Sequence, residues 1–269
     1  MTTLKQIITA IIATAVLFAS KYISRLMANH LSISGEVVFD VAYILAAIIT
    51  LLIIYILHKK FVPLQLNIRK RCNLTTTIYE LIALFIIIRI FSIIVGVIAV
   101  YIDNELITAG NIDMDFTKMG AVDLLILVVS SSIAAPIVEE IIFRGILLNA
   151  MSRIMSIRNA VIITSLIFGL LHRTSVATVV ITTILGIALA CIYIANNNLI
   201  NSIIVHGLYN LLALFISYKI QVIDPWIQSL EILNFNPLSM LLGGAALYIW
   251  LGVIAYDKLE AKYGKRRQY

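Results

Sequence analysis

The sequence PIVEEIIFR, residues 136–144, carries charged side chains inside an apolar run that covers about residues 124–150. Such a run is long enough to cross a bilayer, for which a helix needs about 20 residues. A charged side chain at the centre of a membrane helix costs about 2.5–3.5 kcal/mol on insertion scales. Because Glu139, Glu140 and Arg144 lie so close together, we interpret this stretch as a functional site within the membrane.

The composition of the whole chain is that of a membrane protein. The chain has 269 residues, of which 61% are hydrophobic and 13% are charged, and its mean hydropathy is +1.03. Soluble domains average about 45–50% apolar and about 25% charged residues. The net charge of +6 fits basic cytoplasmic loops better than nucleic-acid binding, and no nucleic-acid partner is expected. The two cysteines, Cys72 and Cys191, lie in different surroundings and indicate no disulfide framework.

Apolar segments of membrane-spanning length recur along the chain. They predict an all-α, polytopic transmembrane bundle of about eight spans. The predicted spans are residues 5–27, 37–57, 76–101, 121–150, 158–173, 176–195, 199–219 and 237–256.

The charged residues between the spans predict the orientation of the bundle. Loop 58–75 carries five basic residues, loop 102–120 carries four acids and one lysine, and the tail after residue 256 carries five basic residues. Lys and Arg collect on the cytoplasmic side of membrane proteins. Both termini are therefore expected in the cytoplasm. The protein is expected to be a multi-pass protein of a cell membrane, and the general character of the chain favours a bacterial plasma membrane.

Two further spans carry polar side chains that suit chemistry. His206 and Asn210 are four residues apart and share one helix face, and His172 ends the short span 158–173. With a rise of 1.5 Å per residue, the inner ends of the spans lie about 16 Å from Glu139, about 20 Å from His172 and about 10 Å from His206. A common site on the cytoplasmic side of the midplane is therefore geometrically allowed.

The two neighbouring glutamates are expected to differ. Glu140 and Arg144 are spaced to pair along the helix, whereas Glu139 points about 100° away. Glu139 is therefore the better candidate for a general base or acid, and Glu140 for a structural ion pair. A packing network of buried ion pairs without catalysis stays open as an alternative.

Local sequence predicts an irregular backbone beside these carboxylates. Pro136 removes a helical hydrogen bond and frees a carbonyl near Ser132, and serines occupy residues 130–132. Irregular backbone at membrane depth is tolerated only against protein or a water-filled cavity. Small residues such as Gly186 and Gly207 would let helices pack closely there.

Three motifs together resemble a known family. They are EExxxR at residues 139–144, FxxxH at residues 168–172 and HxxxN at residues 206–210. In this order, each within a membrane helix, they are similar to the CPBP family (CAAX proteases and bacteriocin-processing enzymes, also called Abi). The resemblance covers about residues 121–220. It divides the chain into N-terminal transmembrane helices over 1–120, a catalytic core over 121–220, and a last helix with a basic tail over 221–269.

The resemblance implies an intramembrane, glutamate-dependent endopeptidase related to the type II CAAX prenyl endopeptidase. It assigns activation of a water to Glu139 and His172. It assigns stabilisation of the oxyanion to His206 and Asn210, and supporting roles to Glu140 and Arg144. The expected partners are the lipid bilayer and a substrate that is a membrane protein or a membrane-associated, lipid-modified, leader or pheromone peptide. The site is expected to open toward the cytoplasm.

The sequence leaves open alternatives to the expected lack of a cofactor and to the expected protease activity. No cofactor or metal is expected, and an HExxH zinc motif is absent from the sequence. The alternative is a zinc ion held by Glu139, His172 and His206. The same fold could instead serve bacteriocin self-immunity or act as a membrane scaffold or regulator. A transporter with a proton relay is a third hypothesis, against which the sequence shows no inverted repeat.

Overall fold

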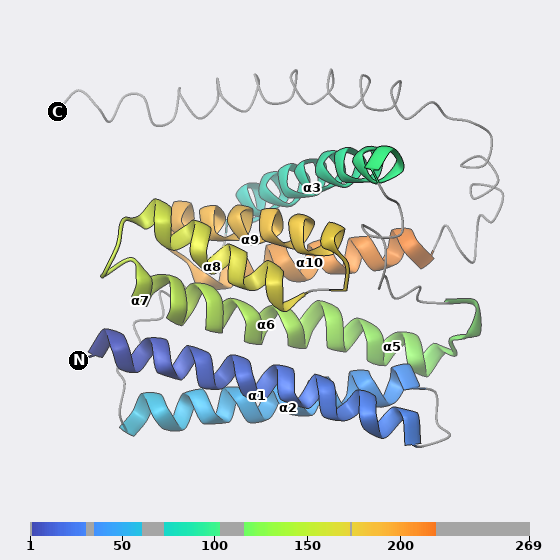
Figure 1. The fold of residues 1–269 in the computed structure, drawn as a ribbon, viewed down its shortest axis with the longest axis horizontal. Helices are drawn as coiled ribbons and strands as arrows, with labels where there is room; N and C mark the ends of the chain where they lie inside the picture. Colours follow the sequence, from blue (N-terminus) through green and yellow to red (C-terminus); the bar gives the residue numbers. More distant parts are fainter. Residues whose placement is uncertain (1, 31–34, 61–72, 103–115, 173, 219–269) are drawn as a thin grey trace.

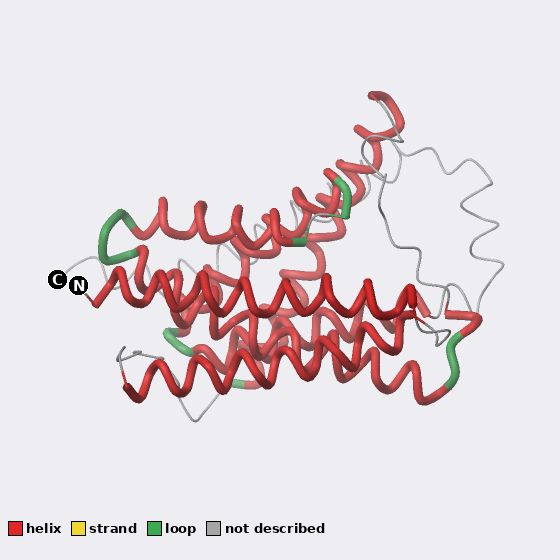
Figure 2. The backbone as a smooth tube through the Cα atoms, turned by 60° about the horizontal axis from the view of Figure 1, so that its bottom comes forward, coloured by secondary structure: helices red, strands yellow, loops and turns green. Residues whose placement is uncertain are grey.

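The computed structural model describes residues 2–30, 35–60, 73–102, 116–172 and 174–218 of the chain. Those residues form helices joined by short turns, and no strand occurs among them (Figures 1 and 2). The predicted all-α class is confirmed. The helices are α1 (Thr2–His30), α2 (Gly35–Lys60), α3 (Leu74–Ile102), α8 (Ile157–Leu171), α9 (Val176–Asn196), α10 (Leu199–Tyr218) and one long helical run, Ala121–Met151.

The run Ala121–Met151 changes its helical type along its length. It begins with α5 (Ala121–Val129), continues as α6 (Ala135–Glu140) and ends with α7 (Asn149–Met151). Wider π-helical turns lie between these parts, at Ser130–Ala134 and Ile141–Leu148. Such π-helical turns are rare and occur frequently at functional sites. Both flank the short α6, which carries the two adjacent glutamates.

The described helices form a membrane bundle. Five of them are long and apolar enough to cross a bilayer: Val38–Leu57, Leu74–Val95, Ala121–Met151, Val176–Asn196 and Leu199–Tyr218. Shorter apolar helices, Thr3–Ala19 and Ile157–Leu171, fall in the predicted spans 5–27 and 158–173. Large apolar side chains face outward, as lipid contact requires. The chain is thus a multi-pass membrane protein.

Part of the predicted topology lies beyond the described residues. The eighth predicted span, 237–256, and the basic tail fall outside them. The total of eight spans and the cytoplasmic placement of both termini therefore stay predictions.

The long run Ala121–Met151 lies at the centre of the bundle (Figure 1). The hairpin of α1 and α2 packs on one side of it, and the hairpin of α8 and α9 together with α10 packs on the other. Helix α3 contacts α9 and α10. Side chains that point inward from this central run can therefore meet residues from most of the other helices.

Glycines allow the closest helix contacts. A Cβ atom at Gly207 of α10 would lie 2.6 Å from the backbone oxygen of Ser132, and one at Gly186 of α9 would lie 3.0 Å from Cβ of Ser165. The first distance is too short for a larger residue without a shift of the backbone, and the second is tighter than most Cβ contacts, so that Ser165 would have to move slightly. The prediction that Gly186 and Gly207 permit close packing is confirmed.

The turn between α8 and α9 brings His172 into the bundle. His172 caps the C-terminus of α8, and the Ser175 hydroxyl caps α9 by accepting a hydrogen bond from the Thr178 amide. Helix α8 is short, so this turn lies well before the end of the bundle that α1 and α5 reach (Figure 1). The end of α8 therefore faces the middle of the long central run.

Candidate active site

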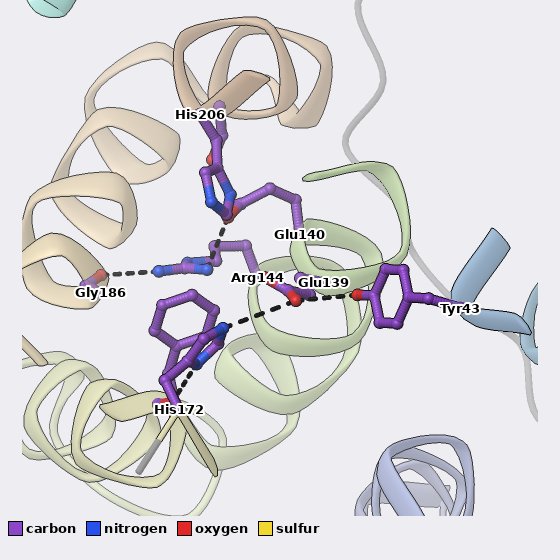
Figure 3. Close-up of polar contacts among 9 residues, drawn as sticks. Tyr43, Glu139, Glu140, Arg144, His172, Gly186 and His206 are labelled. Atoms are coloured by element: carbon purple, nitrogen blue, oxygen red, sulfur yellow. Dashed lines mark hydrogen bonds and ion pairs between the residues drawn. The ribbon is translucent and has the colours of Figure 1, made fainter. Parts of the chain in front are cut away.

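Glu139 lies at the junction of three helical elements. Its side chain on α6 is 3% exposed, and its Oε1 atom accepts a hydrogen bond of 3.0 Å from the Tyr43 hydroxyl of α2 (Figure 3). The Nε2 atom of His172, at the end of α8, lies 3.7 Å from the same oxygen. The structure therefore brings Glu139 and His172 together.

The proton positions on His172 follow from its other contact. Its Nδ1 atom lies 2.8 Å from the backbone oxygen of Phe168, one turn earlier on α8. Because a carbonyl only accepts hydrogen bonds, Nδ1 must carry a proton. In the neutral ring the lone pair of Nε2 therefore faces Glu139. The His172 side chain is 23% exposed, so this edge of the site is the more accessible one.

Glu140 makes a different and fully buried set of contacts. Its Oε1 atom accepts hydrogen bonds from Arg144 at 2.6 Å and from Nδ1 of His206 at 3.0 Å, and its Oε2 atom accepts one from the Ser202 hydroxyl. Arg144 also donates to the backbone oxygen of Gly186, at 2.8 Å. The predicted Glu140–Arg144 pair is confirmed. It joins α6 to both α9 and α10.

Asn210 satisfies a backbone carbonyl of the π-helical turn. Its side-chain amide donates to the oxygen of Ser131 at 2.8 Å. In a π-helix this oxygen would accept from the residue five positions on, which is Pro136 and has no N–H. The sequence predicts a freed carbonyl near Ser132, and the Ser131 carbonyl, one position earlier, accepts the hydrogen bond from Asn210.

The ring of Phe168 fills the space between the charged groups. The guanidinium carbon of Arg144 lies 4.9 Å from its centroid, and the rings of His172 and His206 lie at 4.5 and 6.1 Å. A guanidinium over an aromatic face is electrostatically favourable. Phe168 thus holds the two histidines apart, with His172 on the Glu139 side and His206 on the Glu140 side.

The zinc alternative would require Glu139, His172 and His206 to converge on one ion. Nδ1 of His206 bonds to Glu140, which leaves only its Nε2 for a ligand. Within the described part of the chain, no group of three or more His, Cys, Asp or Glu side chains is placed to hold a metal. The prediction that no cofactor is needed itself stays untested.

Sequence reasoning missed two sets of polar residues. Tyr43 contacts Glu139 but is 96 positions away in sequence, and a single tyrosine in an apolar helix gives no signal. Glu80 of α3 accepts hydrogen bonds from the side chains of Asn196 and Asn201, and Asn201 accepts one from Thr77 at 2.8 Å. An acid in the apolar segment 76–101 was a visible signal for this second cluster.

Comparison with known proteins connects this geometry to one family. Residues 121–212 match the family model described as type II CAAX prenyl endopeptidase Rce1-like. No curated protein and no solved structure matches the chain. The matched segment contains every residue of the three motifs, which are Glu139, Glu140, Arg144, Phe168, His172, His206 and Asn210. The predicted resemblance is therefore confirmed over residues 121–212, where the chain is similar to the Rce1-like type II CAAX prenyl endopeptidases.

Proposed function

We propose that this membrane protein is an intramembrane endopeptidase that hydrolyses a peptide bond of a membrane-associated peptide. The observation that carries the proposal is the facing pair of Glu139 Oε1 and His172 Nε2, 3.7 Å apart and delivered by separate helices. A pair of proton acceptors at this separation suits a shared water molecule better than a direct hydrogen bond. The family match supports a protease in general terms.

In the proposed reaction the water donates one hydrogen bond to Glu139 and one to His172. Its oxygen attacks the carbonyl carbon of the scissile bond while Glu139 accepts the proton. The C–N bond then breaks, and the same proton passes to the leaving nitrogen, so that one water is consumed for each acid and amine formed. Activation by a positioned base contributes about 10²–10⁴-fold to such reactions.

His206 and Asn210 are proposed to stabilise the oxyanion. Glu140 accepts from Nδ1 of His206, so Nε2 can donate to the oxyanion when both ring nitrogens carry a proton, and we propose that His206 acts in this imidazolium form beside the Glu140 carboxylate. One amide hydrogen of Asn210 is used by Ser131, which leaves the other for the substrate. Each such donor contributes about 10²–10³-fold. Glu140 and Arg144 act by fixing the position of His206.

The burial of the site supports a substrate that resides in or on the membrane. Glu139 is almost fully enclosed by helices whose outer surfaces are apolar. A peptide that already resides in or on the membrane, including a lipid-modified, leader or pheromone peptide, reaches such a site without leaving the bilayer. We propose that the site opens toward the cytoplasm, as the predicted topology requires.

The test compares host cells that carry the wild type, Glu139→Gln or Glu80→Gln. The last variant makes the same chemical change at a carboxylate outside the proposed site. Mass spectrometry would profile membrane-associated and secreted peptides at matched protein levels. A peptide cut in the wild type and Glu80→Gln cells, but not in Glu139→Gln cells, is expected. Identical profiles, with a host phenotype that needs only the protein's presence, would favour the immunity or scaffold hypothesis.

A further inference from the structure

We propose that Tyr43, on a helix outside the family-matched segment, is a positioning residue that orients Glu139 and keeps it ionised. The inference rests on the proposed function of Glu139 as the base. It extends the candidate site beyond residues 121–212, because α2 belongs to the N-terminal part of the chain. The N-terminal helices would then complete the site as well as cover it.

The contact is enclosed and directional. Tyr43 is 2% exposed, and its hydroxyl donates to Oε1 of Glu139 at 3.0 Å (Figure 3). Helix α2 packs against α5, α6 and the π-helical turn between them. Ala46 and Ala47, on the same face of α2 as Tyr43, are both buried and small enough to allow this approach.

The chemistry of the hydrogen bond favours the carboxylate form of Glu139. A carboxylate removed from water needs donors in place of the lost solvent. A bond donated by Tyr43 stabilises the ionised form and fixes the rotation of the carboxyl group. Among the described residues, the titratable groups near Glu139 include His172 at the end of α8 and Glu140 and Arg144 on the same helical run. All three are unchanged when Tyr43 is replaced.

The first arm of the test is kinetic. Tyr43→Phe removes the hydroxyl and keeps the ring. The matched control is Tyr193→Phe, since Tyr193 is also buried and its hydroxyl accepts a hydrogen bond from Asn149 at 2.8 Å. We expect Tyr43→Phe to lower kcat for peptide cleavage by about tenfold or more, with KM little changed. The reason is that Glu139, as a charged carboxylate, loses the hydrogen bond from the Tyr43 hydroxyl. Tyr193→Phe should retain kcat.

The second arm does not depend on proteolysis. Dicyclohexylcarbodiimide reacts with protonated carboxyl groups in apolar surroundings, and peptide mapping would measure its addition to Glu139 near neutral pH. We expect labelling of Glu139 to be about tenfold faster in Tyr43→Phe than in the wild type and in Tyr193→Phe. If Tyr43→Phe fails to accumulate, 3-fluorotyrosine at position 43, a stronger donor of similar shape, should instead slow the labelling.

The two arms separate the possible failures. Wild-type labelling rates and wild-type kcat in Tyr43→Phe would overturn the role of Tyr43. Faster labelling in Tyr43→Phe, combined with a wild type that cuts no peptide, would uphold the link between Tyr43 and Glu139 and overturn the proposed protease. Faster labelling with reduced kcat would uphold both.

Discussion

Glu139 and Glu140 are adjacent in sequence, but a helix turns by about 100° per residue, so they point into different surroundings. Glu139 meets the hydroxyl of Tyr43 and the imidazole of His172, whereas Glu140 meets Arg144, His206 and Ser202. The second set includes a full positive charge and is completely enclosed. These different surroundings support the proposal that Glu139 transfers protons while Glu140 holds helices together.

We predict that Glu140→Ala destabilises the protein more than Glu139→Ala does. The first change leaves Arg144 buried without its carboxylate, and breaking a buried ion pair from one side costs about 3–5 kcal/mol. Thermal unfolding in detergent and the yield of folded protein measure the difference. Equal unfolding temperatures and yields for the two variants would contradict the structural role of Glu140.

At the residue scale, helical spacing was sufficient for contacts within one helix. The Glu140–Arg144 pair follows from a separation of four residues. The Tyr43–Glu139 contact joins two helices through tertiary packing, and no local rule connects residues 96 positions apart. Sequence motifs identified which side chains gather here, but not that His206 bonds to Glu140.

At the element scale, the approach of α10 to the central run depends on Gly207. A Cβ at this position would lie 2.6 Å from a backbone oxygen, which cannot rotate away. We predict that Gly207→Val separates the helices, breaks the His206–Glu140 bond and costs about 1–3 kcal/mol or more through overpacking. Gly120→Ala is the control, since its Cβ would meet the nearest atom at an ordinary 3.4 Å. Equal unfolding temperatures in the two variants would count against the close contact.

A second prediction at this scale concerns Glu80, which links α3 to the end of α9 and the start of α10. Its carboxylate accepts from both Asn196 and Asn201. Glu80→Gln weakens one of these bonds and should lower stability by about 1–3 kcal/mol, since hydrogen bonds to charged groups contribute that much. Cleavage measured per folded molecule should persist. Loss of cleavage at full stability would mean that Glu80 belongs to the chemistry instead.

The helices themselves were largely predictable, because long apolar segments bounded by charged loops can form few other structures that satisfy their backbone hydrogen bonds in a membrane. The π-helical turns were not. Proline at position 136 indicated an irregular backbone near Ser132, but not that the turns would be π-helical or that Asn210 would donate to the Ser131 carbonyl. Helical periodicity assumes a regular repeat, so it carries no information about such turns.

At the scale of the whole molecule, the described bundle exposes many large apolar side chains and encloses the charged side chains of Glu139, Glu140 and Arg144. The orientation in the membrane is predicted from basic loops alone. Reporter fusions test it: a fluorescent protein after Tyr269 should fold in the cytoplasm, and alkaline phosphatase inserted in loop 102–120 should be active outside. Active phosphatase fused after Tyr269 would contradict the predicted topology.

The central claim is that Glu139 and His172 activate a water to cut a peptide bond. Membranes containing the wild type, Glu139→Gln or Glu80→Gln would be incubated in water labelled with oxygen-18, and new peptide C-termini would be sequenced by mass spectrometry. Hydrolysis places one labelled oxygen in each new carboxyl group. We expect labelled C-termini with the wild type and Glu80→Gln, and their loss with Glu139→Gln. Labelled C-termini at the wild-type rate in Glu139→Gln would contradict the central claim.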